Sequence, residues 1–427
     1  MSDQFHLLHH FRIVRGLKCA LFFLLFVFFA AFSSVSALAE KICDVHAYGA
    51  TGDGQTKDTS AIQAALDDCA KTGGTVTVEG SPIFISGPLT LRSKVTLSVA
   101  TGTTLKASSN HDDFPEEQQF GELGRRAFLT ARDATDVVIM GGGVIDGQGD
   151  SWWPHRQAGY TRPRLIVFDH CKHVRMENVT AQNSAMWQIV PYYSDDVVFR
   201  NMKVLAPTTS HNTDGIDPFS SSHIVIDHVL IDTGDDNIAI KSGQPNSPGP
   251  DAPSTDISIT DCTLLNGHGL SIGSEVSGGV QRVHVERVHF KGTGTGIRIK
   301  SNRDRGSDIG PLSYSDIDME DVETAILITE FYPKIPTSID SAPVTRLTPH
   351  FHDITISNVR ATGSKEAAVV VGLPESPILG LRLINVSIEA AKGAKLQYVQ
   401  IGVKNFNVRA SSGDGIVTGP GVTKIGN

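Results

Sequence analysis

Six side chains that are able to share one acid-base reaction lie between residues 212 and 300, each beside a short apolar phrase. They are Asp214 in "NTDGID", Asp235 and Asp236 in "GDDNIAIKSG", His268 in "GHG", and Arg298 and Lys300 in "RIK". Glycoside hydrolysis with inversion needs such a set, because a protonated carboxyl group gives a proton to the leaving oxygen while an ionised one activates water. Crowding raises the pKa of one carboxyl group, so we expect one aspartate to stay protonated beside ionised neighbours. The two cations are suited to hold a carboxylate on a substrate.

A repeated phrase predicts how these residues come together. Strand-like phrases recur from about residue 90 onward, and the starts of the clearest ones are 23 to 37 residues apart, as in "DVVIMGG" at 136, "HVRMENV" at 173 and "DVVFRNM" at 196. Each alternates apolar and other residues with period two, and helical periodicity is absent after residue 75. We therefore expect an all-β, single-domain, right-handed parallel β-helix over residues 40–427, with coils stacked about 4.8 Å apart. The alternative, a β-sandwich, needs hairpin turns at shorter spacing.

Stacked coils convert sequence spacing into positions on a surface. The inward-facing anchors of four successive coils are aligned as Ile216, Ile238, Leu270 and Ile297. This alignment puts Asp214, Asp236 and His268 in one column, each two residues before its anchor, with Asp235 one place earlier. Alternation along the strand turns both cations of "RIK" outward on the next coil. Taken singly, "GDD" and "NTD" are ordinary turn sequences, but together the six residues predict one site.

An open end of a solenoid needs a cap, and residues 43–80 are suited to form it. The segment "KDTSAIQAALDDCAKTGG" predicts a short helix with Ile62, Ala65 and Leu66 on one face. Ser60 and Gln63 are expected to form a capping box at its start.

The cysteine spacing excludes a C-x-x-C zinc motif. Four cysteines lie beyond the expected signal peptide. Cys43 and Cys69 flank the predicted helix and are able to pair in an exported protein, whereas Cys171 and Cys262 fit buried thiols equally well.

Residues 1–39 read as a secretory signal peptide. Arg12, Arg15 and Lys18 precede an apolar run, and small residues lead to Ala39, where cleavage is expected. The apolar run is short for a membrane span, so we expect no membrane association after cleavage. A formal net charge of −9 argues against a nucleic-acid partner. The expected location is extracellular or periplasmic.

The four motifs, in this order and at these spacings, resemble those of the polygalacturonases, family 28 of the glycoside hydrolases. The resemblance covers nearly all of residues 40–427, including "YGATGDG" near the start and "DGQGDSWW" at 146–153. It implies that Asp235 is the general acid and that Asp214 and Asp236 hold and deprotonate the attacking water. It also implies that His268 supports the acid, and that Arg298 and Lys300 bind a galacturonate carboxylate.

Three further residues are predicted to bind substrate. The family places a tyrosine on the following coil, which identifies Tyr332 in "ITEFYPK", with Phe331 as its competitor. Asn212 opens "NTDGID". Gln188 lies one coil before Asp214, where it is expected to reach sugar hydroxyls.

The resulting hypothesis is a secreted, inverting hydrolase of α-1,4-galacturonan in pectin, monomeric and without metal or cofactor. Endo and exo action, and xylogalacturonan as substrate, stay open at this point. A calcium-dependent pectate lyase is the rival enzyme, but it needs calcium ligands and an arginine base in place of an acid and water-positioning carboxylates. A non-catalytic carbohydrate-binding β-helix does not require the full set of acids and cations.

Overall fold

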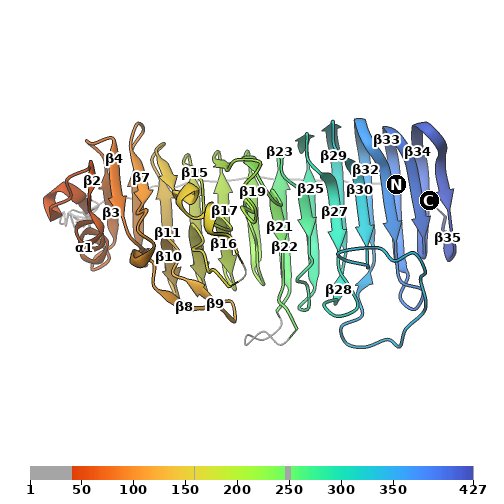
Figure 1. The fold of residues 1–427 in the computed structure, drawn as a ribbon, viewed down its shortest axis with the longest axis horizontal. Coiled ribbons are helices and arrows are strands. Elements are labelled where there is room, and N and C mark those ends of the chain that lie inside the picture. The colour runs from red at the N-terminus through yellow and green to blue at the C-terminus, as the bar shows by residue number, and fades with distance from the viewer. Residues whose placement is uncertain (1–40, 158, 246–251, 427) are drawn as a thin grey trace, which may run out of the picture. The chain divides into compact units, whose positions relative to one another are not determined.

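The computed structural model describes residues 41–157, 159–245 and 252–426. Within these ranges the chain forms a parallel β-helix, in which three stacks of strands run along one axis (Figure 1). The predicted all-β solenoid is therefore confirmed. The predicted signal peptide lies outside the described residues. No helix among the residues that the structure describes is long and apolar enough to cross a membrane.

The first stack follows the repeated phrases, whose strands pair in parallel from one coil to the next. Its strands are β1 (Ile42–Asp44), β3 (Gly74–Val78), β6 (Val95–Val99), β11 (Thr135–Met140), β14 (Lys172–Glu177), β17 (Asp195–Arg200), β19 (Ser222–Asp227), β22 (Ser254–Thr260), β25 (Val280–Glu286), β28 (Asp308–Ile309), β29 (Leu312–Glu320) and β31 (His350–Phe351).

The second stack comes after a tight bend in each coil. It contains β2 (Asp53–Lys57), β4 (Ile83–Ser86), β7 (Thr104–Ala107), β12 (Val144–Asp146), β15 (Thr180–Gln182), β18 (Lys203–Leu205), β20 (Leu230–Thr233), β23 (Thr263–Asn266) and β26 (His289–Lys291). Residues with positive φ recur at the bends of the coils, among them Asn178 and Asn201. Asparagine tolerates this left-handed conformation better than most residues.

The third stack holds the residues that were predicted to do chemistry. It contains β5 (Leu89–Thr90), β10 (Leu129–Arg132), β13 (Ile166–Asp169), β16 (Ile189–Tyr192), β21 (Ile238–Ile240), β24 (Leu270–Ile272), β27 (Thr295–Lys300) and β30 (Thr324–Thr329). Isolated bridges at Ile216 and Phe219 connect β16 with the coil of β21. The last coils are built from long strands that turn from stack to stack: β32 (Ile354–Val371), β33 (Ile378–Gln397) and β34 (Val399–Thr418), followed by the short β35 (Val422–Lys424).

The cap at the N-terminal end contains the predicted helix. This helix, α1, spans Thr59–Cys69 and buries Ile62, Ala65 and Leu66. A disulfide joins Cys43 to Cys69, as the spacing allowed, and Cys171 and Cys262 are buried free thiols.

The expected capping box is wrong. The N-cap residue is Asp58, and its carboxylate accepts hydrogen bonds from the backbone N–H groups of Thr51 and Gly52, at 2.7 and 3.1 Å. The Gln63 amide instead pairs with the backbone of Thr90 in a neighbouring coil. Tertiary contacts have therefore replaced the local interaction that the motif predicts.

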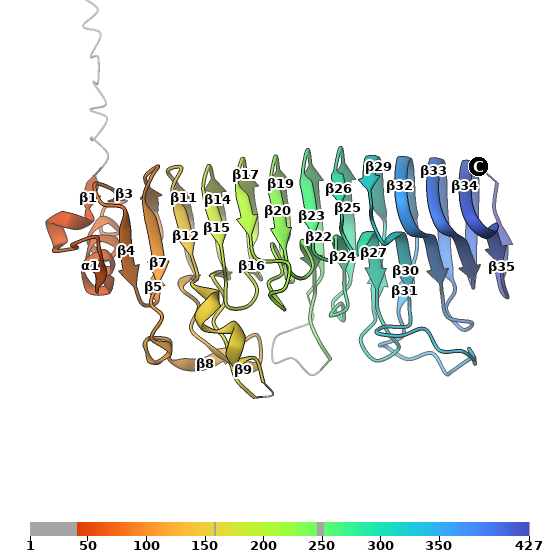
Figure 2. The same cartoon turned by 45° about the horizontal axis from the view of Figure 1, so that its top comes forward.

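Several segments leave the solenoid on one side (Figure 2). They include the antiparallel hairpin of β8 (Glu116–Gln119) and β9 (Glu122–Arg125), and the connections after β27 and β30. Short 3-10 helices lie at Val45–Tyr48, His111–Asp113, Gly149–Ser151 and Trp153–His155.

Candidate active site

The register of the third stack brings the predicted residues together. Ile216 bridges Ile238, Ile238 pairs with Leu270, and Leu270 pairs with Ile297. These are the four aligned anchors, so the predicted column is confirmed. A cavity over these coils is lined by Trp187, Asn212, Asp214, Asp235, Asp236, Lys241, His268, Ser274, Glu275, Arg298, Lys300 and Tyr332.

Asp235 and His268 form a hydrogen-bonded pair at the mouth of β21 and β24. The distance from His268 Nδ1 to Asp235 Oδ1 is 3.0 Å, and the backbone N–H of Asn212 donates to Asp235 Oδ2 at 3.1 Å. The hydrogen bond to Asp235 raises the pKa of His268. Burial opposes ionisation of Asp235, but the hydrogen bond from His268 helps to hold the pKa of this carboxyl below its ordinary value. Both shifts favour the state in which a proton shared by this pair rests on the imidazole.

Asp236 is buried and fully paired. Arg298 Nη1 and Ser271 Oγ donate to its Oδ1 at 2.9 and 2.8 Å, and Lys300 Nζ donates to its Oδ2 at 2.7 Å. Burial raises the cost of a charge here, but the attraction of Lys300 and Arg298 outweighs it and lowers the pKa of Asp236. Asp236 is therefore the permanently ionised carboxylate of the site, the state that a base requires.

Asp214 faces a different cation. Lys241 Nζ lies 3.6 Å from Asp214 Oδ2 and 3.4 Å from Glu275 Oε2. Burial is the larger effect, so the pKa of Asp214 is raised to about 7 despite the lysine. The sequence led us to expect that crowding keeps one aspartate protonated, but burial is the larger cause here, and it raises the pKa of the neighbouring Asp217 well above its ordinary value as well.

Tyr332 and Phe331, the two candidates for the aromatic residue of the site, differ in their burial. Tyr332 lines the cavity, and Lys300 Nζ lies 5.3 Å from the centroid of its ring. Phe331 is 5% exposed and packs with Val369 and Leu373. Only Tyr332 is therefore placed to meet a substrate.

Asn212 also lines the cavity, but its side chain is committed elsewhere. Its Oδ1 accepts a hydrogen bond from Arg162 Nη2 at 2.9 Å. Its backbone N–H, by contrast, supports Asp235.

The prediction for Gln188 is corrected. Its side chain is 0% exposed and its amide makes no hydrogen bond with any residue in the described ranges. Gln188 precedes β16, whose first residue Ile189 is itself part of the buried core, so strand alternation does not hold at this position; the adjacent Trp187 lines the cavity. Trp187 also packs against a cation, with Lys241 Nζ 4.7 Å from the ring centroid.

Sequence reasoning missed four residues that line the cavity: Trp187, Lys241, Ser274 and Glu275. Lys241 is the last residue of "NIAIK" and Glu275 follows "SIGS", so their phrases were read only as strands. Burial disfavours the charged form of Lys241. The nearby carboxylates of Glu275, Asp217 and Asp214 outweigh this effect and raise the pKa of the lysine. The signal available in the sequence was Lys241 itself, because a lysine at an apolar strand position needs buried partners.

A metal ion is disfavoured at the cluster of Asp235, Asp236 and His268. Asp235, Asp236 and His268 do bring ligand atoms within 4.8 Å of one another. Arg298 and Lys300, however, already neutralise Asp236, and their charges repel a cation. The arrangement favours proton transfer by the side chains themselves.

Comparison with known proteins places this chain in a family. The sequence model described as glycosyl hydrolases family 28 matches residues 58–412. An endo-polygalacturonase of Pectobacterium parmentieri is 32% identical over 82% of this chain and 87% of its own. A probable polygalacturonase of Vitis vinifera is 30% identical over 85% of this chain and 77% of its own. Among solved structures, an exopolygalacturonase from Thermotoga maritima covers 88% of this chain and 93% of its own, with 27% identity and a TM-score of 0.77.

Proposed function

Because the chain belongs to glycosyl hydrolase family 28, we propose that it is a polygalacturonase that hydrolyses the α-1,4-galacturonosidic bonds of pectin with inversion. The observation that carries this proposal is the placement of Arg298 and Lys300 beside three carboxyl groups in one cavity. Inverting hydrolysis needs an acid and a base, and a galacturonate unit adds a carboxylate that needs cations. Both requirements are met on four successive coils.

Asp235 is proposed as the general acid. It shares one proton with His268 in the free protein. A bound sugar displaces water from the cavity, and lower polarity favours a neutral pair over an ion pair. The proton then moves from the imidazolium to the carboxylate, and Asp235 gives it to the leaving glycosidic oxygen as the bond to the anomeric carbon breaks.

Asp236 is proposed as the base. It stays ionised beside Lys300 and Arg298, so it is able to accept a proton from water as the water oxygen attacks the anomeric carbon. Asp214 holds the same water. Its proton, retained below about pH 7, removes one negative charge from a cavity that must admit an anionic sugar.

Arg298 and Lys300 are proposed to contact the galacturonate carboxylate while staying paired with Asp236. A guanidinium carries five donors and an ammonium three, so each keeps donors for a substrate. Tyr332 borders the same subsite beside Lys300.

Lys241 is proposed as a positioning residue. Its ammonium group forms an ion pair with the Asp214 carboxyl group, and it is held in place by a second ion pair with Glu275 and by its contact with the Trp187 ring. Such a contact restricts the rotamers of Asp214, and with them the place of the attacking water.

The test uses de-esterified polygalacturonic acid with a chelator present. We expect saturated products with new reducing ends, and Asp235→Asn should lower turnover by several orders of magnitude while the melting temperature stays close to that of the parent. Unsaturated products that vanish with chelator indicate a lyase. Near-normal turnover of Asp235→Asn contradicts the assigned acid.

Export is proposed from the sequence of residues 1–39. The mature chain should begin at Glu40. Intact-mass measurement of protein recovered outside the producing cells checks the cleavage site.

A further inference from the structure

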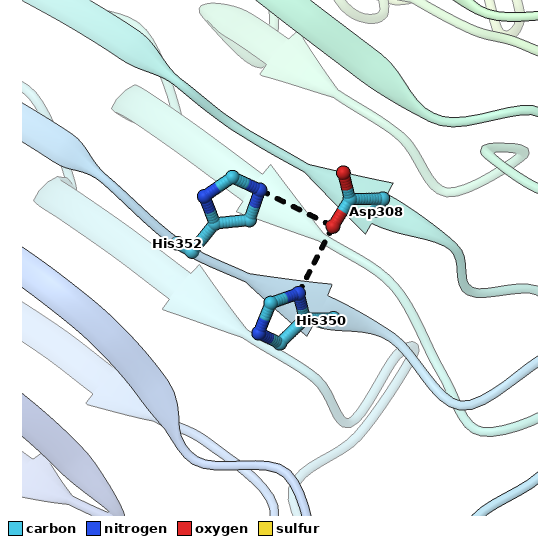
Figure 3. A group of neighbouring side chains, drawn as sticks. All are labelled: Asp308, His350 and His352. Atoms are coloured by element: carbon cyan, nitrogen blue, oxygen red, sulfur yellow. Dashed lines mark hydrogen bonds and ion pairs between the residues drawn. The ribbon is translucent and has the colours of Figure 1, made fainter.

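A group of three metal-ligating side chains lies outside the cavity, where two coils begin their first-stack strands (Figure 3). Asp308 belongs to β28, His350 to β31, and His352 follows β31 directly. We propose that Asp308, His350 and His352 form a structural site for a divalent transition-metal ion of the zinc class. This site takes no part in the hydrolytic reaction.

Strand geometry puts the three side chains on one face. Asp308 pairs in register with His350 across the parallel ladder of β28 and β31. His350 and His352 are two residues apart, and alternate residues of an extended segment point to the same side. Their rings are stacked, with centroids 4.9 Å apart and an interplanar angle of 25°. The backbone therefore holds the two imidazoles and the carboxylate together without help from long, flexible side chains.

The distances between the ligand atoms are close to those of tetrahedral zinc coordination. His350 Nδ1 lies 2.9 Å from Asp308 Oδ1, and His352 Nε2 lies 3.2 Å from the same oxygen. Ligands bound to zinc at ordinary bond lengths are about 3.3 Å apart. Two imidazoles and one carboxylate select zinc-like metals over calcium or magnesium, which prefer oxygen ligands.

A second interaction orients one ligand independently of Asp308. His352 Nδ1 lies 2.9 Å from Asp353 Oδ2. When Nδ1 donates its hydrogen to that carboxylate, Nε2 carries the lone pair and faces Asp308. This carboxylate-to-imidazole contact is the usual outer support of a metal-bound histidine.

The exposure of the ligand side chains is consistent with a site that has three protein ligands and one water. The side chains of Asp308 and His350 are 49% and 47% exposed, which leaves room for a water as the fourth ligand. The competing explanation is a set of ion pairs, in which protonated imidazoles contact Asp308 and Asp353 and no metal binds.

An ion at this place would join the ends of two connections that border the cavity. β28 and β31 receive the chain as it returns from the connections 301–307 and 330–349, which carry Arg305 and Tyr332. The two connections already meet through backbone hydrogen bonds, from Gly306 N to Leu347 O and from His350 N to Ser307 O. A metal at this point would cross-link their ends and stabilise the border of the cavity.

Another cluster provides a matched control. Within the described ranges, the groups Asp227, His228, Asp261 and His289, Asp318, Glu320 also collect possible ligands, but each has only one histidine. His289 lies 3.3 Å from Asp318, so His289→Ala removes an imidazole from a comparable ion pair on the same solenoid.

The experiment is a titration of the metal-free full-length protein with zinc chloride, followed by calorimetry and by thermal unfolding. We expect one tight equivalent of zinc and a rise in melting temperature, because the ion binds the folded state. His350→Ala and Asp308→Asn should remove the tight equivalent and the rise, while His289→Ala keeps both. Asp353→Asn should weaken binding by about 10-fold or more.

The readout is independent of hydrolysis, so it stands whether or not the protein cleaves pectin. Equal zinc binding by the parent, His350→Ala and Asp308→Asn overturns the proposal, as does the absence of a tight equivalent in the parent. A melting temperature for His350→Ala that equals the zinc-free parent shows that the variant is folded. Calcium and magnesium should leave all the melting temperatures unchanged.

Discussion

The protonation of Asp214 depends on its burial more than on its partner. Its pKa of about 7 lies far above that of an unfolded aspartate, about 3.9. Between these two values the folded protein keeps a proton that the unfolded chain has released. The contribution of Asp214 to stability therefore falls as pH rises through this window. Asp236 has the opposite shift, so its contribution is fully present above about pH 4 and is lost only in acid.

This difference predicts how two variants respond to pH. Relative to the parent, Asp214→Asn should gain melting temperature as pH rises from about 4 to about 7, because the amide carries no charge to bury. Asp236→Asn should be destabilised by a nearly constant amount over the same range, because it leaves Arg298 and Lys300 without their partner. Melting temperatures at several pH values check both. Parallel curves for the two variants contradict the assigned protonation states.

Lys241 should act on the reaction through Asp214. We expect Lys241→Met to lower kcat by roughly tenfold or more, because Asp214 loses the contact that positions it. Loss of this cation also raises the pKa of Asp214 further, so the fall of activity on the alkaline side should move to higher pH. The pH profile of kcat measures both effects. Lys241→Arg should recover part of the activity that Lys241→Met loses. If the pH profile of kcat is the same in the parent and in a folded Lys241→Met protein, Lys241 has only a structural role.

The cap and the third stack make different contributions at the level of secondary structure. In the third stack, parallel pairing fixes register, so a side chain two residues before its anchor on one coil lies over its counterpart on the next. At the cap, α1 covers the open end of the solenoid and is joined to β1 by the Cys43–Cys69 disulfide. The disulfide stabilises the end of the ladder, and the site lies many coils away from it.

Removal of the disulfide should therefore affect stability and leave the chemistry intact. The cysteines are 26 residues apart, and a loop of this length corresponds to roughly 3 kcal/mol of stabilisation. We expect Cys43→Ser with Cys69→Ser to lower the melting temperature clearly while KM at room temperature is unchanged. Cys262→Ser is a control for replacing a buried cysteine without loss of a cross-link. An equal loss of stability in that control contradicts the proposed contribution of the disulfide.

The hollows of the whole molecule favour internal cleavage of a polymer. On one side the cavity adjoins a hollow that contains Met186 and Arg162, next to Trp187 and Asn212. On the other side it adjoins a hollow lined by Glu275 and by Arg305, which donates to Ser274 at 3.0 Å. We therefore expect a polysaccharide chain to extend beyond the cavity in both directions.

We accordingly expect endo action. Early samples of a digest of polygalacturonic acid should contain saturated oligomers of many sizes, as separated by anion-exchange chromatography. Monomer or dimer alone from the first time point contradicts an open groove, and would show that the hairpin β8–β9 or the connection 330–349 closes one end. Size-exclusion chromatography in the same buffer checks the expectation of a monomer.

The sequence by itself determined the solenoid and the column of candidate catalytic residues. Parallel coils repeat one register, so the spacing of Ile216, Ile238, Leu270 and Ile297 was sufficient to superpose Asp214, Asp236 and His268. The family motifs added roles for these residues, and those roles remain proposals.

Only the tertiary structure decided what surrounds each side chain. Gln188 is buried rather than exposed, and Gln63 pairs with Thr90 rather than capping its own helix. Lys241, which belongs to none of the recognised motifs, lies beside Asp214 and Glu275. The pKa of Asp214 is raised to about 7 for the same reason, because a pKa depends on burial and on the charges nearby. Spacing along a chain fixes which residues can stack, whereas burial and partners arise from packing in three dimensions.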